Sequence, residues 1–166
     1  MERGCPEKIH YSLNKYVPFS VNIRKSITMN MQSAFGSLNW LGIVLAALSA
    51  FALGGLWYSP LMFVKIWARE AGIDMNADKR GNMAVIFGLA FVLSFIAAFF
   101  LAMFIGPEQT ASFGAMAGFL AGTGWVATLL GIFYLFEGRS LTLFLINACY
   151  AIISLTIMGL IIGAMQ

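Results

Sequence analysis

Charged residues are scarce in this 166-residue sequence: only 10% are Asp, Glu, Lys or Arg, whereas 60% are hydrophobic. Soluble domains are about 25% charged and about 45–50% apolar, so these residues supply too little polar surface for a water-soluble fold. Five of the ten basic residues lie in the first 25 positions and the other five lie in short connecting segments, with no basic stripe interleaved with aromatic residues. This distribution argues against nucleic acid as a partner.

Side chains for metal, redox and catalytic chemistry are equally scarce. Cys5 and Cys149 are too few and too far apart for a disulfide framework or a zinc site, and the one histidine, His10, lies in the tail. Cys149 lies in an apolar run, so we expect a small buried hydrophobic residue. The sequence also lacks a nucleophile elbow and a phosphate-binding loop. We therefore expect no catalytic residues, no cofactor and no metal site, and hence no enzyme.

Long uncharged runs are the main positive feature. None of them contains Asp, Glu, Lys, Arg or His: Leu41–Tyr58, Met83–Ile105, Phe113–Phe136 and Leu141–Met165. About 20 helical residues cross a hydrocarbon core roughly 30 Å thick, and a charge at its centre costs roughly 2.5–3.5 kcal/mol. The runs predict four transmembrane helices over about 38–59, 83–105, 113–136 and 141–165. No run has the polar–apolar alternation of barrel strands.

The connections predict how these helices are joined. Gly106–Ser112 and Glu137–Ser140 are tight loops, which predict an all-α, antiparallel, up-and-down four-helix bundle. The longer first connection begins with Pro60, which ends one helix or opens the next. In Leu61–Ala71, apolar residues recur at helical spacing with Lys65 and Arg69 on another face. This pattern indicates a short amphipathic helix in the membrane interface or, alternatively, a solvated loop helix.

Residues 1–37 form a polar tail that differs from the membrane domain expected over 38–166. Two interpretations are open: a disordered tail, or an upstream start codon with Met29 or Met31 as the true start.

Cations near the expected spans predict the orientation. Arg24 and Lys25 lie before the first span. More cations fall in the first and third connections: Lys65, Arg69, Lys79, Arg80 and Arg139. We therefore expect these connections in the cytoplasm and both termini outside, in a bacterial cytoplasmic membrane.

Small residues recur every fourth position in the first three runs, and a shorter pair occurs in the fourth. In the last two runs the residues at this spacing are glycines: Gly114, Gly118 and Gly122, and then Gly159 and Gly163. Small residues let helix backbones approach closely in lipid. We expect packing within one bundle, with homo-oligomer formation through one of these faces as the alternative. The bilayer is the expected partner.

Few polar residues lie at membrane depth. Asn147 needs hydrogen-bond partners and should face the bundle, and Tyr150 lies three residues along on a similar face. With Thr123 they form a candidate polar cavity, although an amide that holds helices together is the simpler interpretation. An aromatic motif closes the first run: Trp57, Tyr58, Ser59 and Pro60, with Lys65 and Trp67 beyond. It predicts an aromatic belt at the membrane boundary or, less simply, a binding site facing the amphipathic segment.

Several of these residues resemble a bacterial membrane family known as domain of unknown function 1761. The similar segments are Asn39–Leu41, Gly54–Leu61 with Lys65 and Trp67, Gly118–Gly122 with Gly124–Val126, Tyr134–Glu137, and Leu143–Ala148 with Tyr150 and the closing Met158–Gly159. The resemblance covers about residues 38–166 and implies a four-helix membrane protein without an assigned activity. Our first hypothesis is a small non-enzymatic packed bundle. The alternative is a minimal carrier or channel for a small neutral or apolar solute.

Overall fold

The computed structural model describes residues 36–74 and 82–166. The chain divides into two units, Met1–Gly36 and Ser37–Gln166, and every helix named below belongs to the second unit. The predictions for the tail before residue 36 and for Lys79 and Arg80 lie outside the described residues.

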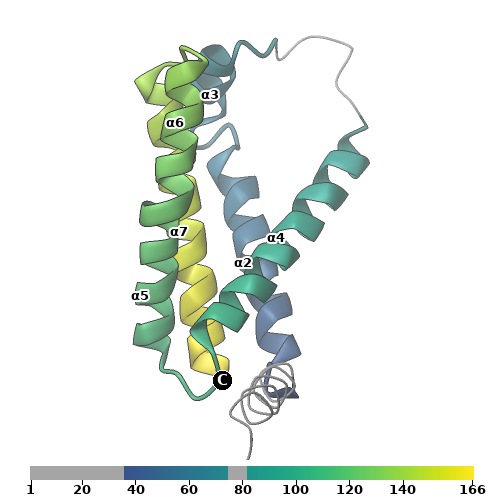
Figure 1. Cartoon of the computed structure of the whole chain (residues 1–166). Coiled ribbons are helices and arrows are strands. Elements are labelled where there is room, and N and C mark those ends of the chain that lie inside the picture. The colour runs from purple at the N-terminus through teal and green to yellow at the C-terminus, as the bar shows by residue number, and fades with distance from the viewer. Residues whose placement is uncertain (1–35, 75–81) are drawn as a thin grey trace, which may run out of the picture. The chain divides into compact units, whose positions relative to one another are not determined.

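Four described helices are long and apolar enough to cross a membrane, as the uncharged runs predicted. They are Trp40–Trp57 (α2), Met83–Ile105 (α4), Ala111–Phe136 and Leu141–Met165 (α7) (Figure 1). The third span is built from α5 (Ala111–Ala121), a π-helical segment η2 (Gly122–Ala127) and α6 (Thr128–Phe136). A short helix, α3 (Val64–Ala71), follows α2, and the described residues contain no strand.

Side-chain caps fix where each long helix begins. Asn39, Asn82, Thr110 and Ser140 each accept a hydrogen bond from a backbone N–H in the first turn of the helix that follows. These N–H groups have no partner inside the helix, and an unpaired donor is costly where water is scarce. The polar residues at the edges of the uncharged runs therefore set the helix boundaries.

Large hydrophobic side chains cover much of the surface. Leu135 and Phe136 at the end of α6 are 82% and 92% exposed, and α6 buries no residue. The buried core is small and lies where α2, α4 and α7 meet, around Ile43, Ala98 and Ile162. Exposure on this scale would be unfavourable in water, whereas acyl chains solvate it. The distribution supports a membrane protein.

The α5–α7 contact is made by backbone against backbone. A Cβ added at Gly114 would overlap the Gly159 carbonyl oxygen, and one at Gly118 would overlap the Leu155 carbonyl oxygen. A Cβ at Gly122 would lie 2.8 Å from Ile152 Cα, and one at Gly163 would overlap the Thr110 carbonyl oxygen. The five glycines singled out in the sequence therefore all lie at this one helix–helix contact. In Figure 1, α5 and α7 lie side by side.

α4 buries side chains only in its C-terminal half. Its buried residues are Ala98, Leu101, Ala102 and Ile105, whereas the segment from Met83 to Ala90 is exposed throughout. Figure 1 shows the first half of α4 leading away from the other helices. An apolar cleft is left between that half and α2.

Candidate functional site

Asn147 joins two other segments to α7. Its side-chain oxygen accepts a hydrogen bond from the Tyr58 hydroxyl (2.8 Å), and its amide nitrogen donates to the Tyr134 hydroxyl (2.8 Å). Tyr58 caps the end of α2, and Tyr134 lies in α6. An amide near the membrane needs such partners. The bonds tie the ends of two spans to the first half of α7.

Trp57 lies inside the protein, so the aromatic-belt prediction is wrong for this residue. Its side chain is 8% exposed, and its indole N–H donates to the Ile146 carbonyl oxygen of α7 at 3.2 Å. Its ring also packs on Phe63, with the ring centres 4.9 Å apart. The indole N–H needs an acceptor, and α7 supplies one beside the apolar surface that buries the ring.

Tyr58 also points inward. Its ring meets Trp67 of α3 and Tyr150 of α7 edge to face, with centres 5.3 Å apart in both pairs. Its hydroxyl is the donor in the bond to Asn147.

The other members of the motif are Ser59, Pro60 and Lys65, and they take no part in the ring contacts described above. The Ser59 hydroxyl donates to the Leu56 carbonyl oxygen and accepts from the Leu61 N–H, which shapes the turn between α2 and α3. Pro60 is exposed in that turn, and α2 ends three residues before it. Lys65 is exposed on α3.

The candidate polar cavity of Thr123, Asn147 and Tyr150 does not form as one site. The Thr123 hydroxyl bonds back to the Phe119 carbonyl oxygen of its own helix at 2.8 Å. The Tyr150 hydroxyl donates to the Ala50 carbonyl oxygen at 3.3 Å and lies against Gly54. Thr123 is in η2 and lines none of the three cavities described below, because its hydroxyl has an acceptor one turn back.

Cys149 is exposed, which corrects the expectation that it is buried.

The largest of these cavities is the cleft between α2 and α4, with a volume of about 640 Å³. Its wall is mostly apolar, with Phe51 against the rings of Phe87 and Phe91. Tyr58 and Tyr150 line its inner side. The cleft therefore suits an apolar molecule.

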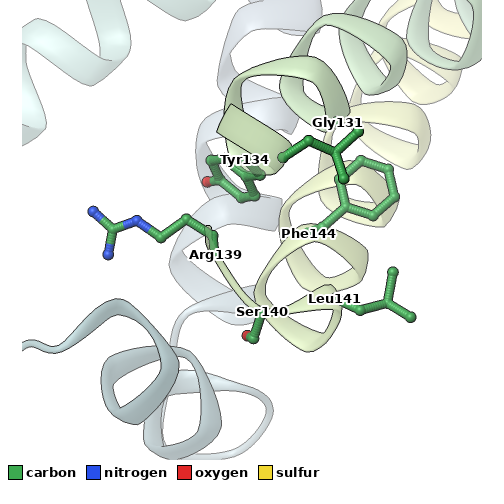
Figure 2. Close-up of a pocket in the computed structure, with 7 residues that line it drawn as sticks. Gly131, Tyr134, Arg139, Ser140, Leu141 and Phe144 are labelled. Atoms are coloured by element: carbon green, nitrogen blue, oxygen red, sulfur yellow. The ribbon is translucent and has the colours of Figure 1, made fainter. Parts of the chain in front are cut away.

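Two smaller cavities lie beside the turn between α6 and α7, and the second of them also borders α3. A groove of about 330 Å³ between α6 and α7 is lined by Gly131, Tyr134, Leu135, Arg139, Ser140, Leu141 and Phe144 (Figure 2). A chamber of about 200 Å³ is lined by Trp67, Ala71, Tyr134, Glu137, Arg139, Leu143 and Asn147. We call them the α6–α7 groove and the polar chamber. Tyr134 and Arg139 line both.

Charged side chains surround this corner. Glu137 accepts from Arg139 Nε at 3.1 Å, and Glu70 of α3 pairs with Arg69 at 3.0 Å. A hydrogen bond with the Ser140 hydroxyl, followed by the bond with Arg69, lowers the pKa of Glu70. Because Ser140 caps α7, this contact links α3 to the start of the last span.

Sequence reasoning did not single out Tyr134 as a site residue. A signal was present: a tyrosine near the end of an otherwise apolar run, across a short turn from Asn147, brings a polar group to the same depth. The two cavities at this corner had no signal in the sequence, because they depend on how far α6 stands from α7.

A family model described as "Protein of unknown function (DUF1761)" matches residues 41–163. The chain belongs to this family. The match confirms the resemblance carried by the motifs of the first and fourth spans, and it brings no assigned activity. Neither the curated proteins nor the solved structures include a match to the chain.

Proposed function

We propose that the protein is a non-enzymatic multi-pass membrane protein in which polar side chains hold the helices together. The observation that carries this proposal is Asn147, bonded on one side to Tyr58 and on the other to Tyr134. An amide committed to two phenols is suited to holding helices and is a poor catalytic group. Among the described residues no group of three or more metal-ligating side chains occurs.

The test is Asn147→Leu, with Thr156→Val as the matched control on the same helix. Thr156 bonds only to the Ile152 carbonyl oxygen of α7, so its loss leaves the contacts between helices intact. We expect Asn147→Leu to lower the free energy of unfolding by about 1–3 kcal/mol, because both phenols lose their partner. Unfolding in detergent measures both variants. Unchanged or higher stability of Asn147→Leu would contradict the proposal.

The proposed arrangement is an antiparallel, up-and-down bundle. The order of contacts along the third and fourth spans supports it: Gly114 meets Gly159, Gly122 meets Ile152 and Gly131 meets Phe144. As residue numbers rise in one span, they fall in the other. The proposal further places α3 in the membrane interface as an amphipathic helix, with Val64 and Ala68 buried and Lys65 and Arg69 exposed.

The proposed location is a bacterial cytoplasmic membrane, with the first and third connections in the cytoplasm and both termini outside. Lys65, Arg69 and Arg139 support it, since they lie in the corner formed by α3 and the α6–α7 turn. Fusing a phosphatase reporter, active only outside the cytoplasm, after Gln166 and after Gly138 tests this. Activity after Gly138 and none after Gln166 would reverse the orientation.

The bilayer is the proposed partner. Self-association through the small-residue faces has less support, because these faces are already covered inside the chain. Gly114 lies against Gly159, Gly118 against Leu155 and Gly163 against Thr110. A dimer would need other small residues, such as Gly88 and Gly124, whose surroundings in the described chain are open. Crosslinking of the purified protein in lipid tests for a dimer.

The second candidate function is a carrier or channel for a small neutral or apolar solute. The observation that favours it is the cleft of about 640 Å³ beside Tyr150. Its test is uptake by vesicles containing the wild-type protein or a Gly55→Phe variant. Gly55 lines the cleft and has open space around it, so the new ring enters the cleft without displacing the backbone. Equal uptake by both proteins would contradict the carrier.

A further inference from the structure

The α6–α7 groove and the polar chamber are two cavities that share Tyr134 and Arg139, and their other walls are unlike. Together they make a candidate site with two parts. The groove is walled by Leu135, Leu141 and Phe144, and the chamber by Trp67, Glu137 and Asn147. The site lies at the turn that follows the third span, where a bilayer changes from acyl chains to headgroups. An occupant matched to both parts must be amphiphilic.

Tyr134 and Arg139 line the junction between the two parts, and both carry hydrogen-bond donors. The Tyr134 hydroxyl accepts from Asn147, and its own proton is donated to no group among the described residues. Glu137 accepts a hydrogen bond from Arg139 Nε. The two terminal nitrogens of the same guanidinium make no hydrogen bond to any described residue. Figure 2 shows the Arg139 side chain extending away from Leu141 and Phe144. These donors suit a phosphate.

The polar chamber holds groups of the opposite kind. Glu137 supplies a carboxylate, with its side chain 54% exposed, and Trp67 supplies an aromatic ring. A carboxylate and an aromatic face both attract an ammonium group. The Arg139 guanidinium lies at the junction and the Glu137 carboxylate lies in the chamber beyond it. This order of charges matches a headgroup in which a phosphate is followed by an amine.

We propose that this site binds a zwitterionic phospholipid with a primary amine, phosphatidylethanolamine being the chemical class. One acyl chain lies in the α6–α7 groove, the phosphate contacts Arg139 and Tyr134, and the ammonium lies between Glu137 and Trp67. The pairing of charges selects against phosphatidylglycerol, which has a phosphate for Arg139 but no cation for Glu137. It also selects against phosphatidylcholine, whose quaternary amine has no N–H to donate to Glu137.

The packing of the third span explains why the groove exists. Glycines bring α5 against α7, but after the π-helical segment α6 buries no residue, and Tyr134–Asn147 is its described side-chain hydrogen bond to α7. A π-helical turn shifts the face that a helix presents, and such turns are frequent at functional sites. Gly131 then lets the Phe144 ring approach its backbone, which closes the inner end of the groove.

Native mass spectrometry of the purified full chain tests the proposal, with phosphatidylethanolamine, phosphatidylglycerol and phosphatidylcholine of identical acyl chains added in turn. We expect one phosphatidylethanolamine per chain, bound at least about tenfold more tightly than either other lipid, which corresponds to one charged hydrogen bond. Equal retention of phosphatidylethanolamine and phosphatidylglycerol by the wild-type protein would overturn the proposal without recourse to any variant.

Two substitutions in the exposed turn separate the roles of the charges. Arg139→Gln should weaken phosphatidylethanolamine binding at least about tenfold. Glu137→Gln should remove the preference for phosphatidylethanolamine over phosphatidylglycerol while keeping phosphate binding. Arg69→Gln is the control, because Arg69 is 73% exposed, pairs with Glu70 and lines neither cavity. If Arg139→Gln and Arg69→Gln bind alike, or if Glu137→Gln keeps the preference, the site is not the one proposed.

Discussion

The two halves of α7 are held by different means. Its second half, Ile152–Met165, meets α5 through glycines, where backbone lies against backbone. Its first half, Leu141–Ala151, is held by side chains: Trp57 bonds to the Ile146 carbonyl oxygen, and Tyr58 and Tyr134 bond to Asn147. In lipid, burying an apolar side chain gains little, so close approach and hydrogen bonds are the two available sources of stability.

This difference bears on function, because all three cavities described above border the first half of α7. Close backbone contact excludes other molecules, whereas contacts made by long polar side chains hold helices apart. The α6–α7 groove and the polar chamber both border the first half of α7. The part of the helix that is less tightly packed is therefore where a binding site forms.

The largest expected effect comes from adding a methyl group to the glycine contact. Gly118→Ala places a Cβ against the Leu155 carbonyl oxygen, which cannot move alone, so the helices must separate. We expect the free energy of unfolding to fall by about 3 kcal/mol, measured by denaturation in detergent.

The matched variant lies in the other half of the same span. Gly131→Ala meets the edge of the Phe144 ring at 3.2 Å, and a ring can rotate away. We expect its stability to stay within about 0.5 kcal/mol of the wild type. Equal losses for Gly118→Ala and Gly131→Ala would remove the contrast between the two halves.

The next effect concerns the phenols around Asn147. Tyr58→Phe and Tyr134→Phe each remove one hydrogen bond to this residue and should each cost about 1–2 kcal/mol. A double-mutant cycle in detergent measures whether the two bonds depend on each other. Because both bonds orient one amide, we expect the double variant to lose less than the sum of the single losses. Strict additivity would mean that the amide is held in place by other contacts.

A smaller effect separates the buried tryptophan from the lipid-facing ones. Trp57→Phe loses the bond to the Ile146 carbonyl oxygen and should cost about 1 kcal/mol, whereas Trp40→Phe should cost little because Trp40 is 54% exposed. Brominated lipids provide a second measurement, since they quench tryptophans that face acyl chains. We expect removal of Trp40 or Trp125 to reduce the quenched signal. Quenching that falls instead when Trp57 is removed would restore the aromatic-belt interpretation for that residue.

The smallest effect is the dependence on pH of the α3–α7 contact. The pKa of Glu70 is lowered in the folded state, so its ionised form stabilises the fold. That contribution is fully present above the pKa of the unfolded state and is lost as the pH falls through the lower, folded-state pKa. We expect the melting temperatures of the wild type and Glu70→Gln to differ slightly at pH 7 and to converge in this acidic range. A difference that is constant with pH would contradict the role of the carboxylate.

Some features of the site were accessible from the sequence. The cost of an unpaired amide required partners for Asn147, and the structure supplies Tyr58 and Tyr134. The sequence did not show which residues these partners would be, because Tyr58 lies 89 residues before Asn147 and Tyr134 lies 13 residues before it. The inward turn of Trp57 was missed for a similar reason: a tryptophan at the end of a span faces lipid unless another helix offers it an acceptor.

The sequence by itself determined that the chain has four helices long and apolar enough to cross a membrane, because the cost of burying charge in hydrocarbon acts on each residue separately and needs no knowledge of its neighbours. It also marked the glycines that let two helices meet. Only the tertiary structure decided that these glycines pack against one another, that α6 stands off from α7 after the π-helical segment, and that Tyr134 and Arg139 line two cavities at once. Those outcomes depend on the distance and orientation of whole helices, which are set by many contacts acting together.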